Sequence, residues 1–158
     1  MRTEYIWTAE KKREMWGEGT WVDEPDLVEW EPEEAPELVG LIRRHDELGM
    51  LCGYVGVPPA HPWHGQSKER IGDDDQGWDV GLTYVGLFAV EDGPSAINTK
   101  RWWVGFDCAH WLDVIPFMER LRSGFRRSLR PSSGLPEPTY KHFRWVRTEV
   151  EKACAHSD

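Results

Sequence analysis

The sequence lacks the features that would place it in a membrane, outside the cell or on duplex DNA. No apolar run comes near the ~20 residues that a bilayer-spanning helix needs, and residues 1–16 hold no apolar leader segment. Acidic side chains number 28 against 19 basic ones, which gives a formal net charge of −9 over 158 residues. The basic footprint of a duplex-DNA-binding protein is therefore missing. We expect a soluble cytoplasmic protein that binds neither membranes nor duplex DNA.

Cysteine is also scarce. Cys52, Cys108 and Cys154 are an odd number, and without a secretion signal they do not predict a disulfide framework. We expect buried free thiols, because a free cysteine packs like a small apolar residue. Tryptophan, by contrast, is abundant, with ten residues. Indole rings occur in cores, at interfaces and under ligands, so their number does not distinguish these roles.

The length fits one domain with its own core, and we expect residues 1–158 to fold as a single unit. The first 20 residues are weakly patterned and could remain flexible, apart from a short strand near residues 5–7. Residues 24–37 hold three prolines and seven acids, which predicts a solvated loop with at most a short strand near residues 27–30. Further loops are expected at 66–77 and 131–138.

Apolar patterning predicts strands in the first two thirds of the chain. The apolar arms at 38–45 and 50–57 flank a connector that contains Asp46 and Gly49, which is typical of a β-hairpin. Two more strands are expected at 78–90 and 101–106. We therefore expect an antiparallel sheet that contains this hairpin.

The last third of the chain has a helical pattern. Apolar residues recur every four positions from Pro116 onward, and residues 139–156 show a second apolar face. The first face consists of Phe117, Leu121, Phe125 and Leu129, and the second of Tyr140, Phe143, Val146 and Val150. Strands first and helices last predict an α+β fold, with the sheet packed against one or two C-terminal helices.

Polar side chains gather where the strand at 101–106 ends. Asp107, Cys108, His110 and Asp113 lie within seven positions of one another. Asp107 could cap the next turn by accepting backbone N–H groups, and Asp113 could be the N-cap of the following helix. Neither role accounts for His110, so the segment also predicts a polar site.

A metal is one possible occupant of that site. The loop at 58–65 supplies His61 and His64, which with Cys108 and His110 would give zinc a tetrahedral ligand set. Magnesium or manganese would prefer Asp107, Asp113 and the acids at 73–75. These spacings match known metal motifs weakly, so we expect no cofactor and keep a divalent metal as the alternative.

Without a metal, the same groups suit proton transfer. A histidine positioned by a carboxylate works as an acid or base near neutral pH, and His110 with Asp107 is one such pair. His61 or His64 with Asp79 is another. Cys108 shares a strand face with apolar residues, so we do not expect it to be a nucleophile. If the protein is an enzyme, the predicted catalytic residues are His110, Asp107 and His61.

A ligand site could use the same residues together with the strand at 78–90. Glycine allows close approach of a ligand, hydroxyl groups orient it, and aromatic rings stack on a base. The arginine-rich helix after Pro116 could meet phosphates. The predicted ligand-binding residues are His61, His64, Gly81, Thr83, Tyr84, Trp103, Asp107, His110 and Asp113.

Four segments together carry a resemblance. "LCGYVGVPPAHPWHG", "GLTYVG", "WWVGFDCAHWLD" and "YKHFRWVRTEVEKA" resemble, in order and spacing, a family of small uncharacterised proteins encoded by bacteriophages and prophages. The resemblance runs from about residue 38 to 156 and leaves out 1–20 and 116–138. The polar positions that it implies are His61, His64, Gly81, Leu82, Thr83, Asp107, Cys108, His110 and Asp113.

The sequence departs from the family pattern twice. Asp79 stands where the family typically has histidine, which weakens a mechanism that needs that residue. Trp111 and Leu112 stand where Ala-Gly is usual, which could reshape a pocket. Both changes favour binding over catalysis.

The resemblance to phage-encoded proteins suggests a function directed at the bacterial host. The favoured hypothesis is an accessory protein in the host cytoplasm that binds, and sequesters, a small phosphorylated, nucleotide-like defence signal. The first alternative is a hydrolase or lyase that cleaves a phosphodiester or glycosidic bond with His/Asp acid–base groups. The second is a protein–protein inhibitor of a host enzyme. In a fourth interpretation the polar motif only stabilises a turn.

Overall fold

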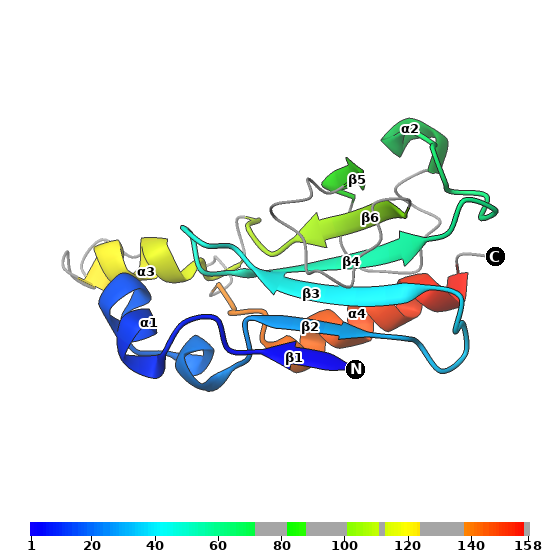
Figure 1. Ribbon diagram of the computed structural model, residues 1–158. Helices are drawn as coiled ribbons and strands as arrows, with labels where there is room; N and C mark the ends of the chain where they lie inside the picture. The colour runs from blue at the N-terminus through cyan, green and yellow to red at the C-terminus, as the bar shows by residue number, and fades with distance from the viewer. Residues whose placement is uncertain (72–81, 88–100, 111–112, 124–137, 157–158) are drawn as a thin grey trace.

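The computed structural model describes residues 1–71, 82–87, 101–110, 113–123 and 138–156. Six strands and four α-helices with one short 3-10 helix make up this part of the chain (Figure 1). In order, they are β1 (Arg2–Glu4), α1 (Ala9–Trp16), η1 (Thr20–Asp23), β2 (Leu27–Trp30), β3 (Val39–Arg44), β4 (Leu51–Val57), α2 (Lys68–Ile71), β5 (Tyr84–Gly86), β6 (Trp102–Asp107), α3 (Pro116–Ser123) and α4 (Phe143–His156).

The strands form one antiparallel sheet in the order β1-β2-β3-β4-β6-β5. The predicted hairpin is confirmed as β3 and β4, which pair from Val39↔Gly56 to Arg44↔Leu51. Its turn needs Gly49, whose φ of 85° lies in the left-handed region. The α+β class is also confirmed, because α4 packs across β3 and β4 on one face of the sheet (Figure 1).

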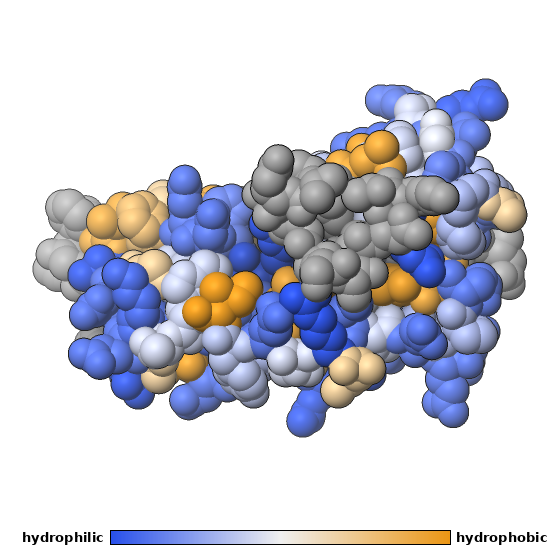
Figure 2. Space-filling view, viewed as in Figure 1, coloured by the Kyte–Doolittle hydropathy of each residue, from blue (hydrophilic) through white to orange (hydrophobic). Residues whose placement is uncertain are grey.

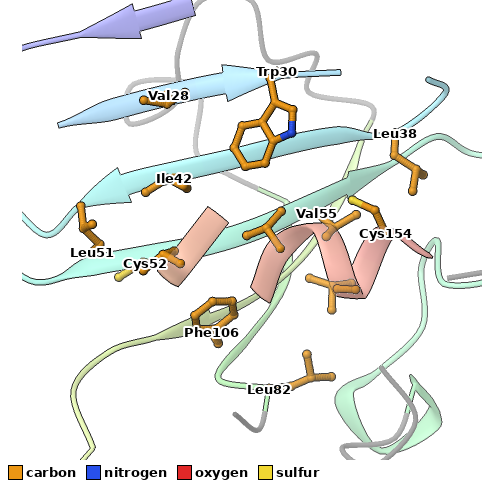
Figure 3. Close-up of a cluster of buried hydrophobic side chains, with 14 of the residues drawn as sticks. Val28, Trp30, Leu38, Ile42, Leu51, Cys52, Val55, Leu82, Phe106 and Cys154 are labelled. Atoms are coloured by element: carbon orange, nitrogen blue, oxygen red, sulfur yellow. The ribbon is translucent and has the colours of Figure 1, made fainter. Parts of the chain in front are cut away.

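The main core lies between the sheet and α4. Side chains that alternate along β4 and β6, such as Val55, Val104 and Phe106, point to this face and are buried with Val146 and Val150 of α4. Figure 3 shows Val55 and Phe106 with other apolar side chains of this core between the strands and the helix. These two helix positions confirm the predicted apolar face.

Glycine lets α4 approach the sheet closely. A Cβ atom at Gly53 would lie 2.8 Å from side-chain atoms of both Phe106 and Val150. Real Cβ contacts are longer, so β4 has a glycine where the helix and a neighbouring aromatic ring cross it.

The opposite face of the sheet has a smaller apolar cluster. Leu27, Leu41 and Trp103 are buried there, with Tyr54 and Tyr84 packed against them. The strand at 101–106 has Val104 buried on one face and Trp103 on the other, so it is buried on both sides, as its apolar sequence suggests. Figure 2 shows the outer surface of this side as largely hydrophilic, with separate apolar patches.

The N-terminal segment is more ordered than we expected. Residues 2–4 form β1, the edge strand, whereas the predicted strand at 5–7 is absent. Thr8 then caps α1 by accepting a hydrogen bond from the Lys11 N–H, at 3.1 Å. Trp16, Trp21 and Val22 form a second core, and Val114 and Tyr140 pack against it.

The acidic segment at 24–37 is not simply a solvated loop, because its first two acids are buried. Asp26 and Glu24 belong to what we call the buried ionic network, whose members are Lys12, Glu24, Asp26, Arg44 and Tyr140. Lys12 Nζ and Arg44 Nε each lie 2.7 Å from Asp26 Oδ1. The network ties α1, β2, β3 and the start of α4 together.

Other boundaries differ from those predicted. The second C-terminal helix begins at Phe143 rather than 139, because the Glu24 carboxylate accepts the Phe143 N–H and Tyr140 is drawn into the buried ionic network. Residues 68–71 form α2 inside an expected loop. The strand expected at 78–90 is described only at 82–87, where β5 is short, and residues 131–137 lie outside the described part.

The α3 helix begins at Pro116, as predicted. Its predicted apolar face is not buried, however, because Phe117 and Leu121 are exposed together with Met118. Phe125 and Leu129 lie outside the described residues. In the part of the chain that the structure describes, each helix falls short of the length and apolar character that a bilayer crossing requires.

Candidate functional site

The register of β4 and β6 separates the two histidine motifs. Val57 pairs with Trp102, and Cys52 pairs with Asp107 at the other end of the same ladder. The loop at 58–65 follows Val57, whereas His110 follows Asp107, so the motifs leave β4 and β6 at opposite ends (Figure 1). At ~3.3 Å per residue, these ends lie about 17 Å apart.

The loop at 58–65 packs on the start of β6. The rings of His64 and Trp102 lie 5.9 Å apart, and the Trp102 indole donates a hydrogen bond to the Gln66 carbonyl at 3.1 Å. His61 accepts the backbone N–H of Trp63 on Nδ1, at 3.1 Å. This bond fixes His61 in the turn and uses one of its two nitrogens.

The zinc hypothesis needed four ligands that the fold does not bring together. His61 and His64 lie at one end of β6, and Cys108 and His110 lie at the other. Among the described residues, no three His, Cys, Asp or Glu side chains are placed to hold a metal ion. The acids at 73–75 and the predicted partner Asp79 lie outside the described part.

Asp107 caps the turn after β6. Its Oδ1 accepts the backbone N–H of Ala109 at 3.1 Å, which is the capping role that the sequence suggested. The predicted pairing of His110 with Asp107 is replaced by a pairing with Asp113. Asp113 also fails to cap α3, because it lies three residues before Pro116 and turns back toward His110.

We call His110, Asp113 and Lys141 the His110 cluster. Asp113 Oδ2 accepts the His110 backbone N–H at 2.9 Å and lies 3.1 Å from His110 Nδ1. Asp113 Oδ1 lies 2.9 Å from Lys141 Nζ. One carboxylate therefore holds two basic side chains, one from each of two distant segments.

Backbone contacts bring these two segments together. Residue Asp113 forms a parallel bridge with Thr139, and the Val114 N–H donates to the Thr139 carbonyl at 3.0 Å. Lys141 then lies between this bridge and α4, with its Nζ 5.5 Å from the centre of the Trp145 ring. The cluster is thus built where the end of β6 meets the start of α4.

Exposure differs sharply within the cluster. The Asp113 side chain is 5% exposed and that of Lys141 is 19% exposed, whereas that of His110 is 42% exposed. The carboxylate holds Nδ1, and the two ring nitrogens lie on different sides of an imidazole. Nε2 is therefore the atom that a ligand or a reacting group would meet.

The thiols do not add a nucleophile. Cys52, Cys108 and Cys154 are all buried and free, as predicted. Burial raises the pKa of the Cys52 and Cys154 thiols to about 12, and it also raises the pKa of Cys108. A thiol that stays protonated at neutral pH is inert.

The remaining predicted ligand residues are scattered. Trp103 is 1% exposed and covers Gly56, where a Cβ would lie 2.7 Å from the indole, so Trp103 is a core residue. Tyr84 donates to the Leu87 carbonyl at 2.6 Å and stacks edge-on against Tyr54. Thr83 is exposed beside β6, and Gly81 lies outside the described residues.

Lys141 is the site residue that sequence reasoning missed. It lies inside the segment "YKHFRWVRTEVEKA", within the helix expected at 139–156. Nothing in its spacing from Asp113 indicates a contact, because the contact depends on the bridge at Thr139. The predicted helix start at 139 also concealed it, since Lys141 precedes α4.

No protein-family model matches the chain, and neither a curated protein nor a solved structure matches it.

Proposed function

We propose that this protein binds a small phosphorylated, nucleotide-like ligand at the His110 cluster. The observation that carries the proposal is an exposed imidazole held by a buried carboxylate, with a lysine on the same carboxylate. The His110 imidazole and the Lys141 ammonium both offer N–H donors of the kind that phosphate oxygens accept.

Two further features support the proposal, and the first of them favours a nucleotide over a bare phosphate. Trp145 is half-buried beside Lys141 and offers an aromatic ring, and bases stack on such rings. The cluster is also fixed before binding, because Asp113 holds both basic side chains. A preformed site loses less side-chain freedom when a ligand arrives.

The resemblance to phage proteins suggests where such binding would matter. A phage protein that withholds a nucleotide signal from the host's defence would act in the host cytoplasm and need no chemistry of its own. Binding that is tight and leaves the ligand unchanged is the expected behaviour of such a protein.

The test is a binding assay with a panel of cyclic and linear signalling nucleotides. The wild-type protein is expected to retain a nucleotide, and His110→Ala should weaken that binding at least about 10-fold. His64→Ala is the matched control, since His64 lies at the other end of β6. Loss of binding in His64→Ala but not in His110→Ala would place the binding site beside the loop at 58–65 and would contradict the proposal. If every nucleotide stayed free, the proposal would fail and a host protein would be the next candidate.

Cleavage of the nucleotide is the second candidate function. The contact of Asp113 with His110 Nδ1 favours it, because this arrangement stabilises an imidazolium during proton transfer. The same assay separates the two functions. A ligand recovered intact after denaturing the protein indicates binding alone, whereas a changed mass that disappears in His110→Ala indicates a hydrolase or lyase.

A further inference from the structure

The β1 strand leaves one edge of the sheet open. Within the described residues, β1 is the last strand beyond β2, and Figure 1 shows it along the lower edge of the sheet. An edge strand has backbone N–H and C=O groups that its single neighbour does not use, and another strand can pair with them.

The charges on this edge are complementary to a second copy of the same strand. Arg2 and Glu4 point to one face of the sheet on either side of Thr3. If two copies pair antiparallel about Thr3, Arg2 of each copy lies opposite Glu4 of the other copy, which gives two such pairs. Opposite charges at directly facing positions stabilise an antiparallel pair.

The apolar residues around β1 follow the same symmetry. Met1 is 87% exposed and Tyr5 is 64% exposed, and they lie two positions before and after Thr3. In the pairing about Thr3, Met1 of each copy lies opposite Tyr5 of the other. This second pair is on the opposite face from the charges, so both faces of the edge are matched.

Within one copy, Arg2 already pairs with Glu4 of its own strand, with its Nη2 2.7 Å from Glu4 Oε1. Pairing about Thr3 places a second such pair directly opposite, so that the four charges alternate in sign.

We propose that two copies of this protein pair through β1, antiparallel about Thr3, to form one continuous sheet across a two-fold axis. Such an interface is isologous, since each residue meets its complement on the other copy. The partner is a second copy rather than another protein because both the charge pattern and the apolar pattern of β1 are complementary to themselves.

Charge exchange tests the pairing. The wild-type protein, with no tag before Met1, is expected to show concentration-dependent dimers by sedimentation over about 1 μM to 1 mM. Arg2→Glu places two acids opposite two acids, and Glu4→Arg places two bases opposite two bases. Each variant should weaken the dimer at least about 10-fold while keeping the wild-type circular dichroism.

Mixing the two variants gives the decisive measurement. The all-acidic edge of Arg2→Glu is complementary to the all-basic edge of Glu4→Arg, so the mixture should form a heterodimer near the wild-type affinity. The double variant Arg2→Glu/Glu4→Arg should again pair with itself. A wild-type protein that stays monomeric, or single variants that dimerise as the wild type does, would overturn the proposal.

Discussion

Two carboxylates in this protein each hold two basic side chains, and their surroundings give them different roles. In the buried ionic network, Asp26 and its partners Lys12 and Arg44 have no more than 1% of their side chains exposed. In the His110 cluster, the carboxylate is almost as deeply buried, but the imidazole that it holds reaches solvent. The exposure of the basic partners therefore distinguishes a structural ion pair from a candidate site.

Hydrogen-bond saturation separates the two groups further. All five N–H donors of Arg44 are used, by Asp26, Glu24, Tyr140 and the carbonyls of Gly49 and Pro25. Lys12 donates to Asp26 and to two carbonyls. A buried charge needs this complete set of partners, because an unsatisfied one costs several kcal/mol. The network has no donor left for a ligand.

Breaking the buried ionic network should have the largest effect. Arg44→Met leaves Asp26 and Glu24 buried without their main partner, and should lower the free energy of unfolding by about 3–5 kcal/mol in urea titrations. Arg13→Met is the control, because Arg13 pairs with Glu18 where both side chains are exposed, and this change should cost less than about 1 kcal/mol. Equal losses in both variants would mean that burial adds nothing to the network.

The carboxylate of the His110 cluster should come next. Asp113→Asn keeps the side-chain shape but removes the charge that holds His110 and Lys141. We therefore expect the free energy of unfolding in urea titrations to fall by about 1–2 kcal/mol. Nucleotide binding should fall as well. Asp107→Asn serves as the control, since Asp107 caps Ala109 and should leave binding unchanged. If both variants bind equally, Asp113 does not organise the site.

The contrast also shows what the sequence could predict. The apolar runs that became β3, β4 and β6 predict strands of a sheet, and the connector that contains Asp46 and Gly49 predicts the hairpin. The turn cap at Asp107 could also be predicted, because that interaction spans only two residues of the chain. The position of His110 at the end of β6 followed from the same strand pattern.

Contacts between distant segments could not be predicted in this way. Glu24 and Tyr140 are 116 residues apart, and nothing in the composition of the acidic segment distinguishes its two buried acids from its exposed ones. Asp113 meets Lys141 only through a bridge between two irregular segments. Such partners depend on how the elements dock, and periodicity describes only single elements.

Removing the exposed imidazole should hardly affect stability. His110→Ala deletes the Nδ1 contact but leaves the backbone N–H on Asp113, so the free energy of unfolding should change by less than about 1 kcal/mol. The same variant should lose the rise in melting temperature that a bound nucleotide gives the wild type. A large loss of stability without ligand would instead make His110 a structural residue.

Glu29 provides the smallest and sharpest test, because this third carboxylate is partly buried and has weaker partners than the other two. Burial raises the pKa of Glu29 above its usual value even though Arg2 and Arg101 lower it, and in the described part of the chain its buried Oε2 has no hydrogen-bond partner. The folded state therefore holds this proton more tightly than the unfolded chain, so stability falls as pH rises through the raised pKa. Glu29→Gln should match the wild type near about pH 4 and be more stable near about pH 7 in urea titrations. If Glu29→Gln were no more stable than the wild type at neutral pH, the two arginines would already compensate the charge of Glu29. Glu29 would then be a structural carboxylate like Asp26.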